Sequence, residues 1–456
     1  MARCRILPLI ILALSASSSD ADTSLVVDHI DIPQVDYEPA IYYDEGDPLP
    51  HLNFARIDWE RIVAKRHRRV VLESDYVRVE VLPEMGRVYS LIDKRTGHDA
   101  LWKNDIVRPG GANNPSGWWL WIGGIEYTLP GYEHGTTFAL PYTWKILEDR
   151  PGRVSMSMAT TEPLTGLIQR VKLTVHRGSA ALETQIRIHN PGADTVQFAH
   201  WVNPMWVPGG ENELTDNTEF IIPTKSILIA DRWQENLGPS PQVWSESPLR
   251  YLRGWKAGDI MADGLTAGYY SAYSHDAEEG VVRVFDPVLN PGVDVWTYGF
   301  HPTEIPMGSG QPNKGYVEMW GGTSVLFPDE TQPLPPGGSL AWTEWMYSYW
   351  GTRGMSAASQ VGAIRGSLDD GSLDIALSPA LELPNVVIEV SVDGKVTVRD
   401  TTSLTPAKVL HRSYSIATEE PLDDLSVEVR QGALQLLWFP VGATLRVAPT
   451  HQVIKK

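Results

Sequence analysis

One segment, residues 118–135, holds more groups able to do chemistry than any other part of the chain. It reads WWLWIGGIEYTLPGYEHG and places three indoles, two phenols, two carboxylates and one imidazole between glycines. Any single tryptophan here would suit a core strand, but the whole set has too many polar edges to bury without partners. A sugar ring offers a C–H face for stacking and hydroxyl edges for hydrogen bonds. The segment therefore predicts a carbohydrate site.

The composition limits the possible partners. The chain of 456 residues has 38 Lys and Arg against 56 Asp and Glu, a formal net charge of −18. A nucleic acid or an anionic membrane requires a basic footprint, so this balance argues against both. With 17 Trp and 17 Tyr against 8 Phe, the aromatic set favours rings with a polar edge, which suits a ligand groove.

The N-terminus has the pattern of a secretory signal peptide. Two arginines precede an apolar run over residues 6–16 and then three serines, and this run is too short to span a bilayer. We expect residues 1–22 to be a signal peptide and the protein to be secreted or periplasmic, with no transmembrane segment in the mature chain. Cys4 is the only cysteine and would be removed with this peptide, so neither a disulfide nor a thiol catalyst is expected.

Alternation of apolar and polar residues recurs along the chain, as in 76–81, 171–175 and 182–188. A period of two is typical of half-buried antiparallel strands, whereas only residues 57–69 have a helical pattern. Strands do not alternate with long helices, so a parallel sheet is not expected. The pattern predicts an all-β protein built as a large sandwich or barrel.

A stretch of small and polar residues at 351–359 indicates a domain boundary. We expect a large domain over residues 25–350, a linker over 351–364 and a small accessory β-sandwich over 365–456. An Asp-Gly pair at 393–394 separates two alternating runs and predicts a tight hairpin in the accessory domain.

Three segments resemble a bacterial domain family of unknown function, the 5107 family. They are residues 73–97, the Gly-Gly-Ile-Glu sequence at 123–126 and the Trp-Thr-Tyr-Gly sequence at 296–299. The resemblance extends over about residues 30–350. The chain departs from the family pattern in having one glycine rather than two before Arg87, which affects the local turn.

A looser resemblance links the chain to galactose mutarotase-like proteins. It lies in the order of His134-Gly135, then His200 and Asn203, then Glu318. It implies an antiparallel β-supersandwich, the fold of aldose 1-epimerases, several glycoside hydrolases and polysaccharide lyases, so the fold alone does not select a reaction. It also implies that Glu318 is the base, that His200 is the acid, and that His134 binds the sugar or shares the acid role. Glu and His can perform these proton transfers near neutral pH.

Other reactions would use other groups. Hydrolysis of a glycosidic bond requires two carboxylates about 5–9.5 Å apart, for which Glu126 and Glu318 are the candidate pair. A lyase would need a cation such as Arg87 and a base such as Tyr127 or His134, although so acidic a chain disfavours a polyanionic substrate.

We predict a secreted carbohydrate-active enzyme that cleaves a glycosidic linkage in an extracellular or periplasmic glycan, as a glycoside hydrolase or polysaccharide lyase. The alternatives are an aldose mutarotase or epimerase and a non-catalytic carbohydrate-binding protein. The expected catalytic residues are His134, His200, Glu318 and Glu126. The expected sugar-binding residues are Trp118, Trp119, Trp121, Tyr127, Trp201, Asn203, Trp206 and Arg87.

No cofactor is expected. Segment 211–217, ENELTDN, is rich in the oxygen ligands that calcium prefers, but it lacks the spacing of an EF-hand loop, which favours a simple turn. The sequence has no P-loop, dinucleotide fingerprint, HExxH or GxSxG motif, which argues against most nucleotide, zinc-protease and serine-hydrolase functions.

Overall fold

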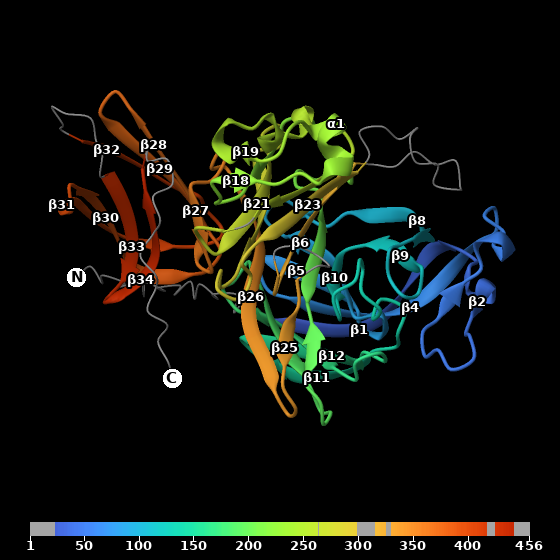
Figure 1. The fold of residues 1–456 in the computed structure, drawn as a ribbon. Coiled ribbons are helices and arrows are strands. Elements are labelled where there is room, and N and C mark those ends of the chain that lie inside the picture. The colour runs from blue at the N-terminus through green and yellow to red at the C-terminus, as the bar shows by residue number, and fades with distance from the viewer. Residues whose placement is uncertain (1–22, 263, 299–314, 325–329, 417–424, 442–456) are drawn as a thin grey trace, which may run out of the picture.

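The computed structural model describes residues 23–262, 264–298, 315–324, 330–416 and 425–441. The predicted signal peptide and Cys4 lie outside these residues. The described chain is an all-β protein, as predicted, and its strands pair antiparallel except for one short parallel contact in the largest sheet (Figure 1). Within the described part, no helix is long and apolar enough to cross a membrane.

The largest sheet has twelve strands. Its order is β20-β23-β24-β16-β10-β6-β5-β4-β1-β8-β9, with the short β7 paired to β6. The bounds are β1 Ser24–Val35, β4 Ile62–Glu73, β5 Val77–Leu82, β6 Arg87–Asp93, β7 His98–Asp99, β8 Lys103–Gly111, β9 Trp118–Gly123, β10 Ile125–Thr128, β16 Trp201–Trp206, β20 Gly258–Ala262, β23 Val293–Tyr298 and β24 Tyr316–Gly322.

A second sheet of eight strands packs on one face of the first. Its order is β11-β12-β13-β14-β26-β22-β21-β17. One apolar core joins the two sheets, because alternate residues of both enter it, such as Val79 and Val81 from the first and Val171 and Leu173 from the second. The bounds are β11 Thr143–Arg150, β12 Arg153–Thr161, β13 Ile168–His176, β14 Leu182–His189, β17 Thr218–Ile221, β21 Tyr269–Ser274, β22 Glu279–Val284 and β26 Ser339–Trp350.

The C-terminal strands form two sheets of four, ordered β27-β28-β29-β32 and β31-β30-β33-β34. They lie to the left in Figure 1, in orange and red. The predicted hairpin is confirmed, because Asp393 and Gly394 both have positive φ and connect β30 to β31. The bounds are β27 Ala357–Ser359, β28 Gly362–Asp369, β29 Ser372–Pro379, β30 Leu383–Val392, β31 Lys395–Leu404, β32 Leu410–Ser415, β33 Leu425–Gln431 and β34 Leu434–Pro440.

Short elements complete the described fold. The paired short strands are β2 Ile41–Tyr42 with β3 His51–Leu52, β15 Val196–Phe198 with β25 Gln332–Leu334, and β18 Ser226–Ile227 with β19 Gln242–Val243. The helices are α1 Gln234–Leu237 and the 3₁₀ turns η1 Glu38–Ala40, η2 Phe54–Arg56, η3 Pro83–Met85, η4 Asp231–Trp233, η5 Trp244–Glu246, η6 Pro248–Arg250 and η7 Leu252–Gly254.

Two expectations about local structure need correction. Residues 57–69, predicted as a helix, run instead into β4, which pairs with β1 along its whole length. Its β-branched residues suit a strand, and pairing with two neighbours outweighs a short helical pattern. The predicted linker 351–364 contains β27 and the start of β28, because its apolar residues Val361 and Ile364 are buried in a core.

That core is shared between the C-terminal sheets and the outer face of the eight-stranded sheet, where Tyr347 and Tyr349 contribute to it. Arg95 fastens the same junction. Its guanidinium pairs with Asp93 and donates hydrogen bonds to the backbone carbonyls of Ser348 and Pro406. The C-terminal sandwich is therefore packed against the body that carries the site described next.

Candidate functional site

Five neighbouring strands of the twelve-stranded sheet present polar side chains to one face. Glu126 of β10 is paired with Asn203 of β16. Two residues further along β16, Met205 is paired with Glu318 of β24. On the next strands, Glu318 is opposite Trp296, which is also the partner of Asp259. Paired residues of antiparallel strands share a face, so these side chains form one row. The residues that alternate with them, such as Val202, Val295, Val317 and Ile260, enter the core.

Glu126 lies between two cations. Its Oε2 atom is 3.0 Å from Nδ1 of His134, and its Oε1 atom is 3.3 Å from Nη2 of Arg87. Arg87, on the adjacent strand β6, also donates a hydrogen bond to the carbonyl of Gly123. These three side chains are at most 5% exposed. Their mutual contacts therefore offset the cost of burying charge.

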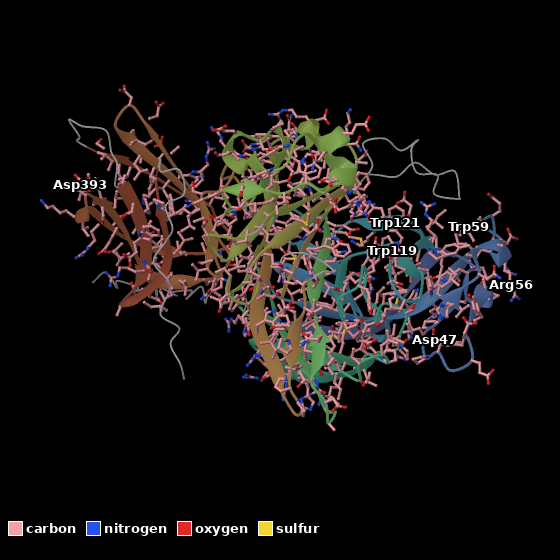
Figure 2. All side chains as sticks on the ribbon, viewed as in Figure 1. Asp47, Arg56, Trp59, Trp119, Trp121 and Asp393 are labelled. Atoms are coloured by element: carbon pink, nitrogen blue, oxygen red, sulfur yellow. The ribbon has the colours of Figure 1, made fainter. Side chains whose placement is uncertain are left out.

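His134 is held in place by a tight loop after β10 and by a tryptophan. The next residue, Gly135, has a φ of +61° and lies so close to the backbone of Leu129 that a Cβ atom would be 2.5 Å from its carbonyl oxygen. The imidazole stacks on Trp119, with ring centroids 3.8 Å apart and an interplanar angle of 1°. Figure 2 labels Trp119 and Trp121, which both lie on β9. The ring position is thus fixed from the backbone and from one face.

Electrostatics favour a charged His134 and an ionised Glu126. Burial alone would lower the pKa of His134, but the charge and hydrogen bond of Glu126 outweigh it and raise that pKa. Burial works against ionisation of Glu126 as well, yet the charges of Arg87 and His134 lower its pKa. The carboxylate binds Nδ1, so a proton on the imidazole Nε2 atom is the one available for chemistry.

Glu318 is the second buried carboxyl group and is surrounded by neutral donors. Asn203 Nδ2 and the hydroxyl of Tyr316 each donate to it at 3.0 Å, and the indole of Trp320 donates as well. Burial nevertheless raises the pKa of Glu318, with the charge of His134 opposing the shift. Tyr316 is held by stacking on Trp102, with centroids 4.3 Å apart. Glu318 is therefore a more basic carboxylate than Glu126.

Two acidic residues that the sequence interpretation missed extend the row. Asp294 of β23 is paired with Trp320, and Asp259 of β20 lies one strand further. Burial, then the charges of Asp259 and Glu318, raise the pKa of Asp294 well above its usual value. Within the described chain, Oδ1 of each aspartate has no hydrogen-bond partner. The alternation Val293-Asp294-Val295-Trp296 was the available signal, since it places Asp294 on the face away from the core.

The predicted sugar-binding residues divide between the site and the core. Arg87, Asn203, Trp119 and Trp121 lie around the row, and Trp201 contacts Trp320. Trp118 instead donates to the Pro50 carbonyl and packs on Phe138. Tyr127 and Trp206 belong to the core between the sheets.

His200 is not brought to the row. Its ring is fully buried between the two large sheets and lies 5.2 Å from Trp342 of β26. Burial, with the nearby charge of Arg283, lowers the pKa of His200 to about 3. The neutral imidazole lies away from Glu318, so the structure gives it no place in the acid role that the resemblance implied.

In segment 211–217, two asparagine side chains bind distant parts of the chain. Asn212 exchanges hydrogen bonds with the backbone of Lys103, and Asn217 donates to Asp276. Across the described ranges, no group of three or more His, Cys, Asp or Glu side chains is placed to hold a metal ion.

Comparison with known proteins gives two family matches. The model described as "Domain of unknown function (DUF5107)" matches residues 47–326. The model described as "YphG-like protein, second domain" matches residues 357–438, which hold the C-terminal sheets.

Solved structures are similar at low identity. A TPR-domain containing protein from Parabacteroides distasonis is 20% identical with a TM-score of 0.58, and the match covers 71% of this chain and 55% of that one. The chain thus spans about half the length of that relative. The Slr1438 protein from Synechocystis matches at 14% identity and a TM-score of 0.47, covering 62% of this chain and 96% of that one. A galactose mutarotase-like protein from Clostridium acetobutylicum matches at 13% identity and a TM-score of 0.44, and the match covers 62% of this chain and 96% of that one.

The ion pair at the centre of the site makes a testable prediction. In Glu126→Gln, the pKa of His134 should fall, because the variant loses the charge that raises it. In the wild type, the raised pKa stabilises the fold below the unfolded value of about 6.5. That stability is lost as the pH rises through the folded value, and this pH dependence should vanish in the variant. NMR titration of His134, with unfolding free energies at several pH values, measures both effects.

Glu183→Gln is the matched control, since Glu183 contacts His176 at 3.0 Å on the surface, away from the row. It should leave the titration of His134 as in the wild type. An unchanged His134 pKa in Glu126→Gln would contradict the assignment of this pair.

Proposed function

We propose that this chain, which belongs to the DUF5107 family, acts on a carbohydrate. In this proposal His134 is the proton donor and Glu318 the proton acceptor at an anomeric centre. The observation that carries this proposal is a buried cation and a basic buried carboxyl group on one polar face, each held by its own partners. The similarity to a protein described as galactose mutarotase-like agrees with a carbohydrate-related role.

The proposed reaction is interconversion of anomers. Glu318 takes the proton of the anomeric hydroxyl while His134 gives a proton to the ring oxygen, so the ring C–O bond breaks and an open-chain aldehyde forms. Closure onto the other face of the carbonyl returns both protons. The carboxylate of Glu126 positions His134 rather than reacting, in the way that a carboxylate orients a catalytic histidine in other enzymes.

The polar atoms that lack partners also support a ligand here. In the described part of the chain, Oδ1 of Asn203 and Oδ1 of Asp294 are buried without a hydrogen-bond partner. Buried polar atoms are rarely left unsatisfied in folded proteins. Sugar hydroxyl groups on this face would donate to them, and the indoles of Trp119 and Trp320 offer apolar surface beside them.

Cleavage of a glycosidic bond is the second candidate, and a different carboxyl pair favours it. Glu126 is neutralised by two cations, which makes it a poor nucleophile or base. Asp294 and Glu318 occupy diagonal positions on adjacent strands, where Cβ atoms are about 7 Å apart. The raised pKa of Asp294 suits a general acid that protonates the leaving oxygen, and Glu318 would attack or activate water.

Export is proposed from the N-terminal signal pattern. Expression with the native N-terminus in a bacterial host should yield a periplasmic or secreted protein that lacks about 22 residues. Intact mass measurement of the exported protein tests this, and a full-length cytoplasmic product would contradict it.

For anomer interconversion, Glu318→Gln and His134→Gln should each lower kcat about 10²- to 10⁴-fold, the usual contribution of a general acid or base. NMR exchange spectroscopy on free aldoses measures the rate. In the pH profile of kcat, the acidic limb reports Glu318 and should have its midpoint above pH 4.5. The alkaline limb reports His134 and should have its midpoint above pH 6.5, because the pKa values of both groups are raised. His176→Gln should keep full activity, as its side chain forms a surface pair. Full activity in both site variants would rule out this assignment.

For cleavage, the wild type should release products from an oligosaccharide panel and Asp294→Asn should lose this release, because the variant has no proton to donate. An intact His134–Glu126 pair in the same variant serves as the folding control. Retained cleavage in Asp294→Asn would eliminate the second candidate. Glycan binding without any product would favour a non-catalytic binding protein.

A further inference from the structure

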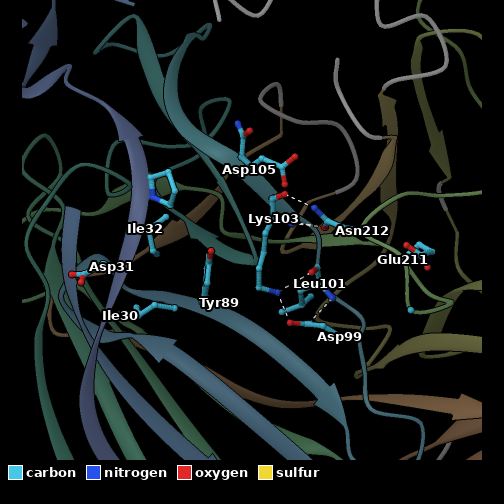
Figure 3. Close-up of a pocket in the computed structure, with 13 residues that line it drawn as sticks. Ile30, Asp31, Ile32, Tyr89, Asp99, Leu101, Lys103, Asp105, Glu211 and Asn212 are labelled. Carbon is cyan, nitrogen blue, oxygen red and sulfur yellow. Dashed lines mark hydrogen bonds and ion pairs between the residues drawn. The ribbon is translucent and has the colours of Figure 1, made fainter. Parts of the chain in front are cut away.

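A cavity of about 420 Å³ lies apart from the polar row. Its walls come from β1, β6, the stretch from the end of β7 to the start of β8, and the loop after β16 (Figure 3). Ile32, Tyr89 and Leu101 form its buried apolar part, whereas Asp31 and Glu211 are exposed at its margin. None of the row's residues lines this space. The cavity is large enough for one small ligand.

Tyr89 places a phenol at the wall of the cavity. The residue as a whole is only 7% exposed. In Figure 3 the phenol rises from its strand into the space between Ile32 and Lys103. Burial raises the pKa of Tyr89, so the hydroxyl stays protonated and is a competent donor. In the cavity this hydroxyl group can donate to water or to a ligand.

The charges around the cavity exclude an anionic ligand. Four carboxylates line it, from Asp31, Asp99, Asp105 and Glu211, against one ammonium group from Lys103. That ammonium is paired with Asp99 and lies 5.1 Å from the Tyr89 ring centroid. Asp31 and Glu211, at the exposed margin, offer acceptors to hydroxyl or ammonium donors.

The chain itself separates this cavity from the row. Leu101 and Lys103 line the cavity, while Trp102, between them, stacks on Tyr316, whose hydroxyl group donates to Glu318. The cavity is therefore a distinct space that shares one supporting segment with the site.

We propose that this cavity is a second carbohydrate-binding site, which takes one pyranose unit without negative charge and prefers an amino sugar. The apolar wall and the Tyr89 ring receive the C–H face of the ring, the Tyr89 hydroxyl bonds a ring substituent, and the carboxylates receive hydroxyl and ammonium groups. This inference goes beyond the proposed function, because it requires no turnover.

The probes are glucosamine, glucose and glucuronic acid, titrated into the full chain and followed by isothermal calorimetry and ligand-observed NMR. Glucosamine should bind more tightly than glucose, and added salt should narrow the difference. Glucuronic acid should not bind. Equal binding of glucuronic acid, or no binding of either other sugar, would overturn the proposal.

Three variants locate the binding. Tyr89→Phe keeps the ring and should weaken glucosamine binding about three- to tenfold, the value of one hydrogen bond. Asp31→Asn, at the exposed margin, should reduce the preference for glucosamine over glucose. Asp44→Asn is the matched control at an exposed acid outside the cavity and should change nothing. Wild-type affinity in both Tyr89→Phe and Asp31→Asn would refute the site.

Glu318→Gln distinguishes this proposal from the proposed function. It should leave Tyr89-dependent glucosamine binding intact while it abolishes any turnover. Binding that depends on Tyr89 in a protein without turnover would support the cavity and remove the enzymatic proposal. Turnover that depends on Glu318, with no Tyr89-dependent binding, would support the enzymatic proposal and remove the cavity as a binding site.

Discussion

The buried carboxylate of Glu126 is the constraint on which the rest of the site depends. Arg87 and His134 bring two positive charges to a position almost without solvent, and Glu126 contacts both. An unpaired charge at such a position would be strongly destabilising. Strand β6, strand β10 and the loop after it must therefore stay in register. Arg87, protonated His134 and Glu126 together carry one net positive charge. Glu318 balances this charge when it is ionised. Protonation of Glu318 and of His134 is thus coupled through one local charge balance.

An ion pair of the eight-stranded sheet holds β24 from the core side. Arg283 is fully buried, pairs with Glu344 of β26 and donates to the carbonyl of Gly321 at 2.8 Å. Gly321 permits this contact, because a Cβ atom there would be 2.6 Å from the Tyr270 hydroxyl and 2.8 Å from the guanidinium. The Glu318 backbone is therefore anchored from the core side. Burial, together with the charge of the same cation, lowers the pKa of His200 to about 3, so this histidine is neutral between the two sheets.

The sequence predicts the all-β fold, because a period of two is a local signal that survives in each strand. The aromatic segment proposes Glu126, and the resemblance to mutarotase-like proteins proposes His134 and Glu318. The structure brings Glu126 and Glu318 to one face of the sheet and His134 into contact with Glu126. Sequence-based prediction fails for residues whose role depends on which face of their strand points to the core. His200 and Trp206 point to the core, although nothing in their local sequence shows it. For Asp294 the alternation with Val293 and Val295 was a signal, since both valines enter the core. Residues 57–69 show the same limit, because pairing with β1 decided between helix and strand.

The order of charges along the row also restricts the chemistry. Its cations lie at one end, at Arg87 and His134, and its acids at the other, at Glu318, Asp294 and Asp259. A lyase acting on a uronic acid needs a cation for the substrate carboxylate. Arg87, the residue expected for that task, is already engaged by Glu126 and by the Gly123 carbonyl. The carboxylate of a uronate would have to displace Glu126 from Arg87, or else lie beside the acidic residues Glu318, Asp294 and Asp259 and be repelled by them. The neutral sugar proposed for this site would meet neither cost.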